Sequence, residues 1–329
     1  MVYQSSWRFL IFSLSVALYG SHVVLINLSK DDNDRVTFNS ATVVLMIEFG
    51  KFISSLLAYL MELLWMPEKS TSRQMWQRVA PLFDVASWIP YVVPAALYSV
   101  NNNLVVHIQH YTDPATFQVL SNMKIPTTAL LYRLLTGRKI PRNKQVALLF
   151  LTIVGMSCSY SGIQAEKEIT AAKGYEDTHR QESMRQHLSL LGLLLILIYS
   201  LVSGFAGVSI EMIMKRRAHI NIKVQNVHLA SFGIMINLLM YLTTADAELS
   251  FFSGYNIWTA LIIVTQIANG MIISFVLKHL GNLTRLLIIS CSAVVTTFVS
   301  HFLFELSLDL YFNLAVCLLF PTLYLYGKD

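Results

Sequence analysis

The chain has 329 residues, of which 55% are hydrophobic and only 13% are charged, and its formal net charge at neutral pH is +5. Soluble domains carry charge on roughly a quarter of their residues, so this chain lacks the polar surface that a soluble fold needs. Its lysines and arginines collect in short segments between apolar runs, which excludes a nucleic-acid-binding protein and favours one that spans a membrane many times.

Apolar runs of about 18 to 25 residues recur along the chain, and each is long enough to cross a bilayer as a helix. The first run is too long for the core of a signal peptide and no cleavage pattern follows it, so we interpret it as a retained span. The pattern predicts an all-α membrane protein with ten transmembrane helices, at residues 7–28, 41–65, 86–109, 114–136, 145–163, 188–213, 222–244, 255–279, 283–305 and 307–326.

A polar, charge-rich stretch divides the predicted spans into two sets of five. It predicts a hydrophilic connector at 164–187 between a first repeat, 1–163, and a second, 188–329. At an offset of 168 residues Asn101 falls on Asn269, so the two parts resemble each other weakly. A five-span repeat enters the membrane the opposite way the second time. We therefore predict two inverted five-helix repeats with a central site between them.

The charge of the loops predicts the orientation in the membrane. The loops after the second, fourth and sixth spans contain PEKSTSRQMWQRVAP, GRKIPRNK and KRRAHINIK, whereas those after the third, seventh and ninth contain no Lys or Arg. Because basic loops stay on the cytosolic side, both termini are predicted to be cytosolic.

Lys124 lies near the middle of the fourth predicted span, with Gln118 and Asn122 close by. A lysine there costs about 2.5 to 3.5 kcal/mol, so it should face the bundle interior or a wet cavity. Pro126 has no backbone N–H, which leaves the carbonyl of Asn122 without its helical partner. Such irregular backbone is tolerated where it lines a cavity. The alternative is an internal ion pair that locks two helices together.

A second lysine, Lys278, lies near the end of the eighth span. Taken alone, it could extend to the membrane surface. Taken with Lys124, it supplies a cation from the opposite repeat, and two ammonium groups in one cavity would suit a ligand that carries phosphate.

The third span contains YSVNNN, which places three amides in the membrane. Asn both donates and accepts hydrogen bonds, so it suits the edge of a base or a ribose. Successive residues fan around a helix by about 100°, so all three cannot face one cavity. We select Asn102 with Asn101 or Tyr98, and interpret Asn103 as a helix–helix contact.

Two pairs of opposite charges lie within spans. Glu48 and Lys51 are spaced i, i+3 and predict a pair with a structural or gating role. Glu211 and Lys215 are spaced i, i+4 near a cytosolic end, where we interpret them as solvated.

Three further patterns are assigned no chemistry. His107, His110 and Asp113 have metal-ligand spacing but no fourth ligand nearby, and the acidic run at 31–35 is interpreted as a solvated turn, so we predict no metal and no cofactor. No nucleophile elbow, P-loop or dinucleotide motif occurs, which argues against an enzyme. The cysteines lie in apolar segments and are interpreted as packing residues: Cys158, Cys291 and Cys317.

The segment YSVNNNLVVHIQHYTDPATFQVLSNMKIPTTALLYRLL resembles the third and fourth helices of nucleotide-sugar transporters of solute carrier family 35, subfamily A. The blocks SGFAGVSIEMIMK, VQNV, VLKH and YLYG match the family in order, so the resemblance covers nearly the whole chain. Within the subfamily the chain is most similar to the branch of CDP-ribitol or probable UDP-sugar transporters.

The resemblance implies a drug/metabolite transporter-like fold in Golgi or endoplasmic reticulum membranes. It also implies exchange of a cytosolic nucleotide sugar for a lumenal nucleoside monophosphate by alternating access. Lys124 and Lys278 would hold phosphates. The nucleoside would be lined by Tyr98, Asn101, Asn102 and Asn226. Relatives often carry Tyr four residues after that last Asn, where this chain has Ala230, which leaves the base and sugar contacts on that wall open.

The expected function is therefore antiport of a pyrimidine nucleotide sugar or CDP-alditol, namely a UDP-sugar, CMP-sialic acid or CDP-ribitol. The alternatives are a carrier of another small phosphorylated organic anion and a non-transporting membrane scaffold. The expected partners are these nucleotides and the lipid bilayer, without nucleic acid. The oligomeric state stays open, with a homodimer as one candidate.

Overall fold

The computed structural model describes residues 2–30, 38–65, 72–108, 111–112, 114–172, 190–244, 251–304 and 309–328, which form helices without any β-strand. Within this part of the chain eight helices are long and apolar enough to cross a membrane, and a bent pair of helices would make a ninth. The predicted all-α, multi-pass membrane architecture is therefore confirmed.

The eight long helices coincide with eight of the predicted spans. They are α1 (Val2–Leu28), α2 (Ser40–Leu64), α8 (Arg142–Ala172), α10 (Leu190–Arg216), α11 (Ile222–Thr244), α12 (Ile257–His279), α13 (Asn282–Phe304) and α14 (Leu310–Gly327). The helix α8 continues past the predicted end of its span at residue 163, so the first residues of the predicted connector, 164–172, are helical. The rest of that connector, 173–187, lies outside the described residues.

Side-chain caps explain where several of these helices begin. The Asn39 side chain accepts a hydrogen bond from the amide of Ala41 before α2, and the Asp309 side chain accepts one from Phe312 before α14, both at 2.9 Å. Asn256 and Thr259 form a reciprocal capping box at the start of α12. Each cap satisfies an amide that the first helical turn leaves without a partner.

The third predicted span corresponds to α4 (Val85–Trp88), the 3₁₀ turn η1 (Ile89–Tyr91) and α5 (Val92–Ile108). An additional helix, α3 (Ser72–Phe83), precedes it in the stretch that the sequence indicated only as a basic loop. The helices on either side of residue 84 are bent by 69°. Asp84 at this bend caps α4, with its Oδ1 accepting from the amide of Ala86 at 3.2 Å.

The fourth predicted span is divided into α6 (Pro114–Leu120), the 3₁₀ turn η2 (Ser121–Met123) and α7 (Lys124–Thr136). The irregular backbone predicted beside Pro126 is present, because the proline cannot donate to the carbonyl of Asn122. The Asn122 side chain adds to the disruption, since its Nδ2 donates to the carbonyls of Gln118 and Val119 at 3.1 and 3.2 Å. No long helix therefore forms across this span.

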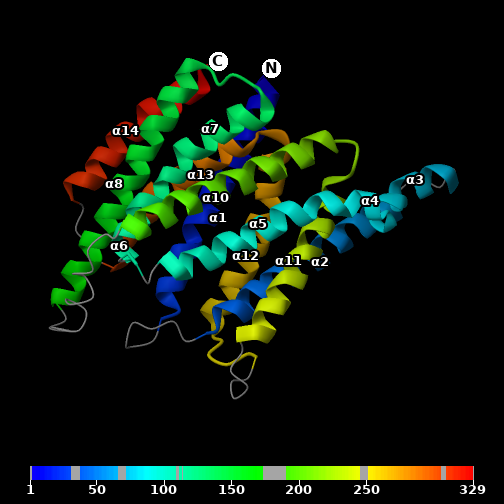
Figure 1. Ribbon diagram of the computed structural model, residues 1–329, viewed down its shortest axis with the longest axis horizontal. Coiled ribbons are helices and arrows are strands. Elements are labelled where there is room, and N and C mark those ends of the chain that lie inside the picture. The colour runs from blue at the N-terminus through cyan, green and yellow to red at the C-terminus, as the bar shows by residue number, and fades with distance from the viewer. Residues whose placement is uncertain are drawn as a thin grey trace. The chain divides into compact units, whose positions relative to one another are not determined.

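The chain forms two compact units, each built from two stretches of sequence. The first comprises residues 1–99 and 209–285. In it α2 packs along α11, α1 packs along α12, and α12 also contacts α2 (Figure 1). Two buried apolar clusters hold these helices together: Ile210, Met214, Ile273 and Leu277 in one, and Tyr59, Ile220 and Val224 in the other.

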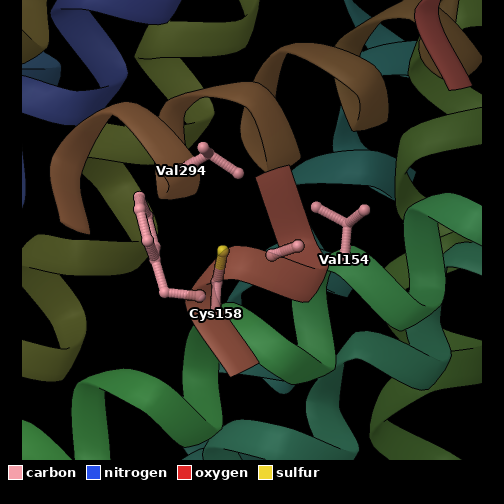
Figure 2. Packing of buried hydrophobic residues seen from close by; sticks show 5 residues of the cluster. Val154, Cys158 and Val294 are labelled. Carbon is pink, nitrogen blue, oxygen red and sulfur yellow. The ribbon is translucent and has the colours of Figure 1, made fainter. Parts of the chain in front are cut away.

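The second unit comprises residues 100–208 and 286–329. In it α8 and α14 run side by side, and α6 and α7 pack on α8 (Figure 1). Figure 2 shows Val154, Cys158 and Val294 converging on one buried cluster, which Phe312 and Ala315 complete. The packing role predicted for the cysteines is confirmed for Cys158 and Cys291, which are buried, and is wrong for Cys317, which is exposed.

Candidate functional site

The turn between α12 and α13 carries two basic residues on a short stretch of chain. Lys278 lies in the last turn of α12, and Arg285 lies near the start of α13. Between them Gly281 has a φ of 98°, in the left-handed region that glycine adopts without strain. The amides of Leu280 and Gly281 both donate to the carbonyl of Val276, at 2.7 and 2.8 Å. These bonds close the end of α12 tightly.

A carboxylate from α10 fixes the other side of this turn. Glu211 Oε2 accepts a hydrogen bond from the amide of Asn282 at 2.7 Å, which caps the start of α13. Its Oε1 pairs with Lys215 at 2.6 Å. Glu211 is only 3% exposed, so its interpretation as a solvated residue is wrong. Glu211 instead anchors the α12–α13 turn to α10.

Lys278 lines a cavity of about 350 Å³ within the first unit. Its ammonium donates to the carbonyl of Ile220 at 2.7 Å, and the residue is half-buried. The cavity lies between the C-terminal ends of α2 and α12, the helix α3 and the α10–α11 turn. Its polar lining consists of Tyr59, Glu62, Gln77, Arg78, His219, Asn221 and Lys278.

The acidic group in this cavity is already neutralised. Glu62 pairs with Lys223 at 2.8 Å, and the side-chain amide of Asn221 donates to both of its oxygens at 3.0 Å. Lys278 is therefore left with a backbone carbonyl as its hydrogen-bond acceptor. An anion that enters the cavity would meet a half-buried ammonium whose charge no carboxylate of the described residues offsets.

Arg285 is a cation that is not among the site residues predicted from the sequence. Its Nη1 donates to the hydroxyl of Tyr98 at 2.8 Å, and Tyr19 from α1 lies close to the guanidinium. Its Nε is buried without a partner among the described residues. The signal that could have found it is its position, because it lies inside the ninth predicted span, where a charge should face a partner or a cavity.

The Glu48–Lys51 pair predicted on α2 forms, with 2.5 Å between Oε1 and Nζ. Two glycines of the neighbouring helices make room for it. A Cβ added to Gly233 of α11 would lie 2.7 Å from Glu48 Oε2, and one added to Gly270 of α12 would lie 2.6 Å from Lys51 Cδ. The pair thus sits where α2 meets α11 and α12.

The second unit contains Lys124 and Gln118. Lys124 is half-buried at the start of α7, and its carbonyl accepts a hydrogen bond from the Thr128 hydroxyl at 2.5 Å. Gln118 is exposed on α6. Lys278 and Lys124 belong to different units, so the predicted chamber that they share stays a prediction.

The predicted amides differ in how they are placed. Asn101 of α5 is buried in the second unit, beside Tyr199. Asn226 of α11 is buried in the first unit, with no hydrogen-bond partner for its Oδ1 among the described residues, and Ala230 is buried one turn further along. Asn102 lies in α5, but its side chain is outside what the structure describes.

Comparison with known proteins gives a consistent result. The sequence model of the nucleotide-sugar transporter family matches residues 5–327. The chain is 41% identical to the probable UDP-sugar transporter protein SLC35A4 of Xenopus tropicalis, covering 95% of this chain and 89% of that protein. It is 36% identical to the protein of the same name from Mus musculus, covering 98% and 94%. It belongs to the nucleotide-sugar transporter family.

Membership of the nucleotide-sugar transporter family makes this protein a transporter and not an enzyme. The fold agrees with a solved crystal structure of a protein that is 11% identical, with a TM-score of 0.65 over 98% of this chain and 96% of that one. At this level of identity the likeness concerns the fold alone.

The patterns set aside as possible metal ligands fall mainly outside the described residues. His110, Asp113 and the acidic run at 31–35 are not described, and His107 is exposed at the end of α5. Among the described residues no group of three or more His, Cys, Asp or Glu side chains could hold a metal ion.

Proposed function

We propose that this protein is an antiporter that exchanges a cytosolic pyrimidine nucleotide sugar, or a CDP-alditol, for a lumenal nucleoside monophosphate. The family supplies the general substrate class, and the relatives from Xenopus tropicalis and Mus musculus are named probable UDP-sugar transporters. UDP-sugars, CMP-sialic acid and CDP-ribitol are the candidate substrates. All of them join phosphate to a pyrimidine nucleoside.

The observation that carries the proposal is the pair of cations at the α12–α13 turn. Neither Lys278 nor Arg285 forms an ion pair with a carboxylate of the described residues. A cation inside a membrane protein is costly unless it is compensated, and such residues commonly mark a substrate pathway. A phosphate group would supply the compensating charge, and the guanidinium matches it with two parallel donors.

The remaining predicted residues would complete the site. Lys124 of the second unit would hold the phosphates together with Lys278. The nucleoside would contact the polar side chains of the third, fourth and seventh predicted spans, which are Tyr98, Asn101, Asn102, Gln118 and Asn226. Ala230, one helical turn after Asn226, would leave room on one wall of the pocket, which is where the identity of the base and of the sugar or alditol would be decided.

Obligate exchange follows from the same charges. Moving cations across the bilayer without an anion between them is unfavourable, so the empty carrier should reorient slowly and the loaded carrier quickly. In this proposal ten spans form two inverted repeats that rock around a central site. The protein would reside in the Golgi or endoplasmic reticulum membrane with both termini cytosolic, as a monomer or a homodimer.

Transport into proteoliposomes tests the proposal directly. Vesicles that contain the full-length protein are loaded with UMP, with CMP or with buffer alone, and labelled UDP-sugars, CMP-sialic acid and CDP-ribitol are offered outside. We expect uptake of one class only, and only into vesicles loaded with the matching monophosphate. Equal uptake into empty vesicles would contradict exchange.

Substitution of the lysines tests the site. Lys124→Ala and Lys278→Ala should abolish uptake, whereas Lys139→Ala, an exposed lysine of the loop after α7, should leave it unchanged. Unchanged uptake in Lys124→Ala would remove Lys124 from the proposed site. If free CMP and UMP fail to compete with a transported anion, the protein carries another phosphorylated compound. If no nucleotide raises its melting temperature, the scaffold alternative gains support.

A further inference from the structure

The helix α3 is amphipathic, and a 69° bend separates it from the apolar segment that follows. At 100° per residue, its apolar side chains occupy one continuous arc, which consists of Leu82, Met75, Val79, Phe83 and Trp76. Arginines occupy the two borders of this arc, at positions 73 and 78. This is the distribution of a helix that lies in the plane of a membrane surface.

One side of the apolar arc of α3, formed by Trp76 and Phe83, faces away from the rest of the first unit. Trp76 is 65% exposed and Phe83 is 72% exposed. The polar side chains of α3 include Gln77 and Arg78, which together with Pro81 line the cavity that also contains Lys278. A soluble helix would show the reverse arrangement, with its apolar side chains packed on the core and its polar side chains outside.

Two hydrogen bonds and one apolar contact hold α3 in this orientation. The Tyr59 hydroxyl donates to the carbonyl of Arg78 at 2.8 Å, and Trp88 Nε1 donates to the carbonyl of Leu82 at 2.9 Å. The Leu82 side chain packs on the cluster that contains Tyr59. The exposed arc is therefore fixed by the fold.

The helix α3 is not needed to cross the bilayer. Residues 85–108 rise about 1.5 Å each, which gives a segment about 36 Å long, enough for a hydrocarbon core of about 30 Å. The 69° bend after Phe83 turns α3 away from the axis of that segment. Trp65, which is 88% exposed at the end of α2, and Trp76 also suit the depth at which tryptophan collects in membranes.

We infer that α3 is a membrane-surface helix that inserts its apolar arc into the cytosolic leaflet and binds anionic lipid headgroups through Arg78, which is exposed and also lines the cavity. The segment 66–83 contains three basic residues and one acidic residue, which complements an anionic membrane surface. Because residues of α3 line the cavity beside Lys278, lipid on one side of this helix would stabilise a cavity wall on the other.

Spin labels on the full-length protein in lipid vesicles test the insertion. The parent variant is Cys317→Ser, since Cys158 and Cys291 are buried. Single cysteines at positions 75, 76, 79 and 83 should be more accessible to oxygen than to a water-soluble nickel chelate, whereas those at 74 and 77 should show the reverse. Equal exposure to the chelate at all six positions would overturn the inference. So would a depth that increases steadily from 75 to 83, as expected for a broken transmembrane span.

The lipid preference is tested with vesicles of phosphatidylcholine, with and without phosphatidylserine. Phosphatidylserine should shift the label at position 76 deeper, and Arg78→Gln should abolish this shift. Arg138→Gln, an exposed residue of another basic loop, is the matched control and should keep it. If the depth is the same in both lipids, or the control also loses the shift, binding of anionic headgroups by α3 is refuted.

Discussion

The guanidinium of Arg285 donates a hydrogen bond to the hydroxyl of Tyr98 at 2.8 Å, and it lies 5.9 Å from the centre of the same ring. Tyr98 is a predicted residue of the nucleoside pocket, whereas Arg285 has no predicted role there. The contact predicts that Arg285 positions Tyr98, in addition to placing a charge beside the α12–α13 turn.

Loss of this hydrogen bond should weaken nucleotide binding. Tyr98→Phe keeps the ring but leaves one donor of the guanidinium without its acceptor. Hydrogen bonds to charged groups contribute about 1.5 to 3 kcal/mol to stability, so we expect a lower midpoint of thermal unfolding. We also expect the half-saturating nucleotide concentration to rise, because the ring loses the contact that fixes its position. Titrations of melting temperature with UMP and CMP measure this change. Tyr324→Phe, an exposed residue of α14, is the control and should bind as the parent does.

A double-mutant cycle separates the two roles of Arg285. If it acts mainly by positioning Tyr98, the combined variant Tyr98→Phe with Arg285→Gln should bind little worse than Arg285→Gln alone. If the two losses multiply, the residues contribute independently and the positioning role is refuted.

Gly281→Ala should destabilise the protein through the backbone of the α12–α13 turn. The residue has a φ of 98°, and a Cβ there would lie 2.8 Å from Glu211 Oε1. We expect a loss of about 1 to 3 kcal/mol, seen as a lower midpoint of thermal unfolding in detergent, together with reduced transport. Gly162→Ala in α8 is the control. Nothing lies within 4 Å of its added Cβ, so it should keep or slightly raise the midpoint.

The Glu48–Lys51 pair should respond differently to single and double substitution. Glu48→Gln leaves a partly buried ammonium without its counter-charge, so it should lower the thermal midpoint more than Glu48→Gln combined with Lys51→Gln. Measurement of transport in parallel decides the role of the pair. If the double variant unfolds at the parent temperature but transports slowly, the pair acts in gating. If both variants match the parent in both assays, it has neither role.

Substitution of Gly233 in α11 tests the packing around the Glu48–Lys51 pair independently. Gly233→Ala would place a Cβ 2.7 Å from Glu48 Oε2, so either the carboxylate or the helix must move. We expect a lower thermal midpoint, and an unchanged one would mean that α2 and α11 are less closely packed than the structure indicates. In the Glu48→Ala background the further loss caused by Gly233→Ala should be smaller than in the parent, because the shorter side chain removes the clash.

The sequence was sufficient to predict most of the helices, because a run of apolar residues long enough to cross a bilayer has few other outcomes. It also indicated irregular backbone at Asn122, since Pro126 removes a specific hydrogen bond, although it predicted one span through 114–136. It did not reveal α3. A helix of 12 residues with alternating polar and apolar arcs has little mean hydropathy, so a search for long apolar runs passes over it.

The sequence indicates which types of residue belong to the candidate site, but it does not indicate their tertiary contacts. A cation inside a span stands out in the sequence, and Lys124 and Lys278 are predicted site residues on that ground. The tertiary contacts of Glu211 and Arg285 are not visible in local spacing. Glu211 caps a helix 71 residues away along the chain, and Arg285 bonds a tyrosine 187 residues away. Only the fold brings such groups together.

The final prediction concerns whether Lys124 and Lys278 act on the same ligand group. Each single substitution to Ala should weaken UMP binding roughly ten- to a hundred-fold, the range expected for loss of a charge-assisted hydrogen bond. Substitutions of two groups that hold one phosphate have strongly non-additive effects on the binding free energy, because a phosphate released by one lysine is poorly placed for the other. The fold-loss of UMP affinity in the double variant should therefore be much smaller than the product of the two single fold-losses. Titrations of melting temperature with UMP measure all three losses. Losses that multiply fully would mean that the two ammonium groups contact separate parts of the ligand, and the shared phosphate site would have to be abandoned.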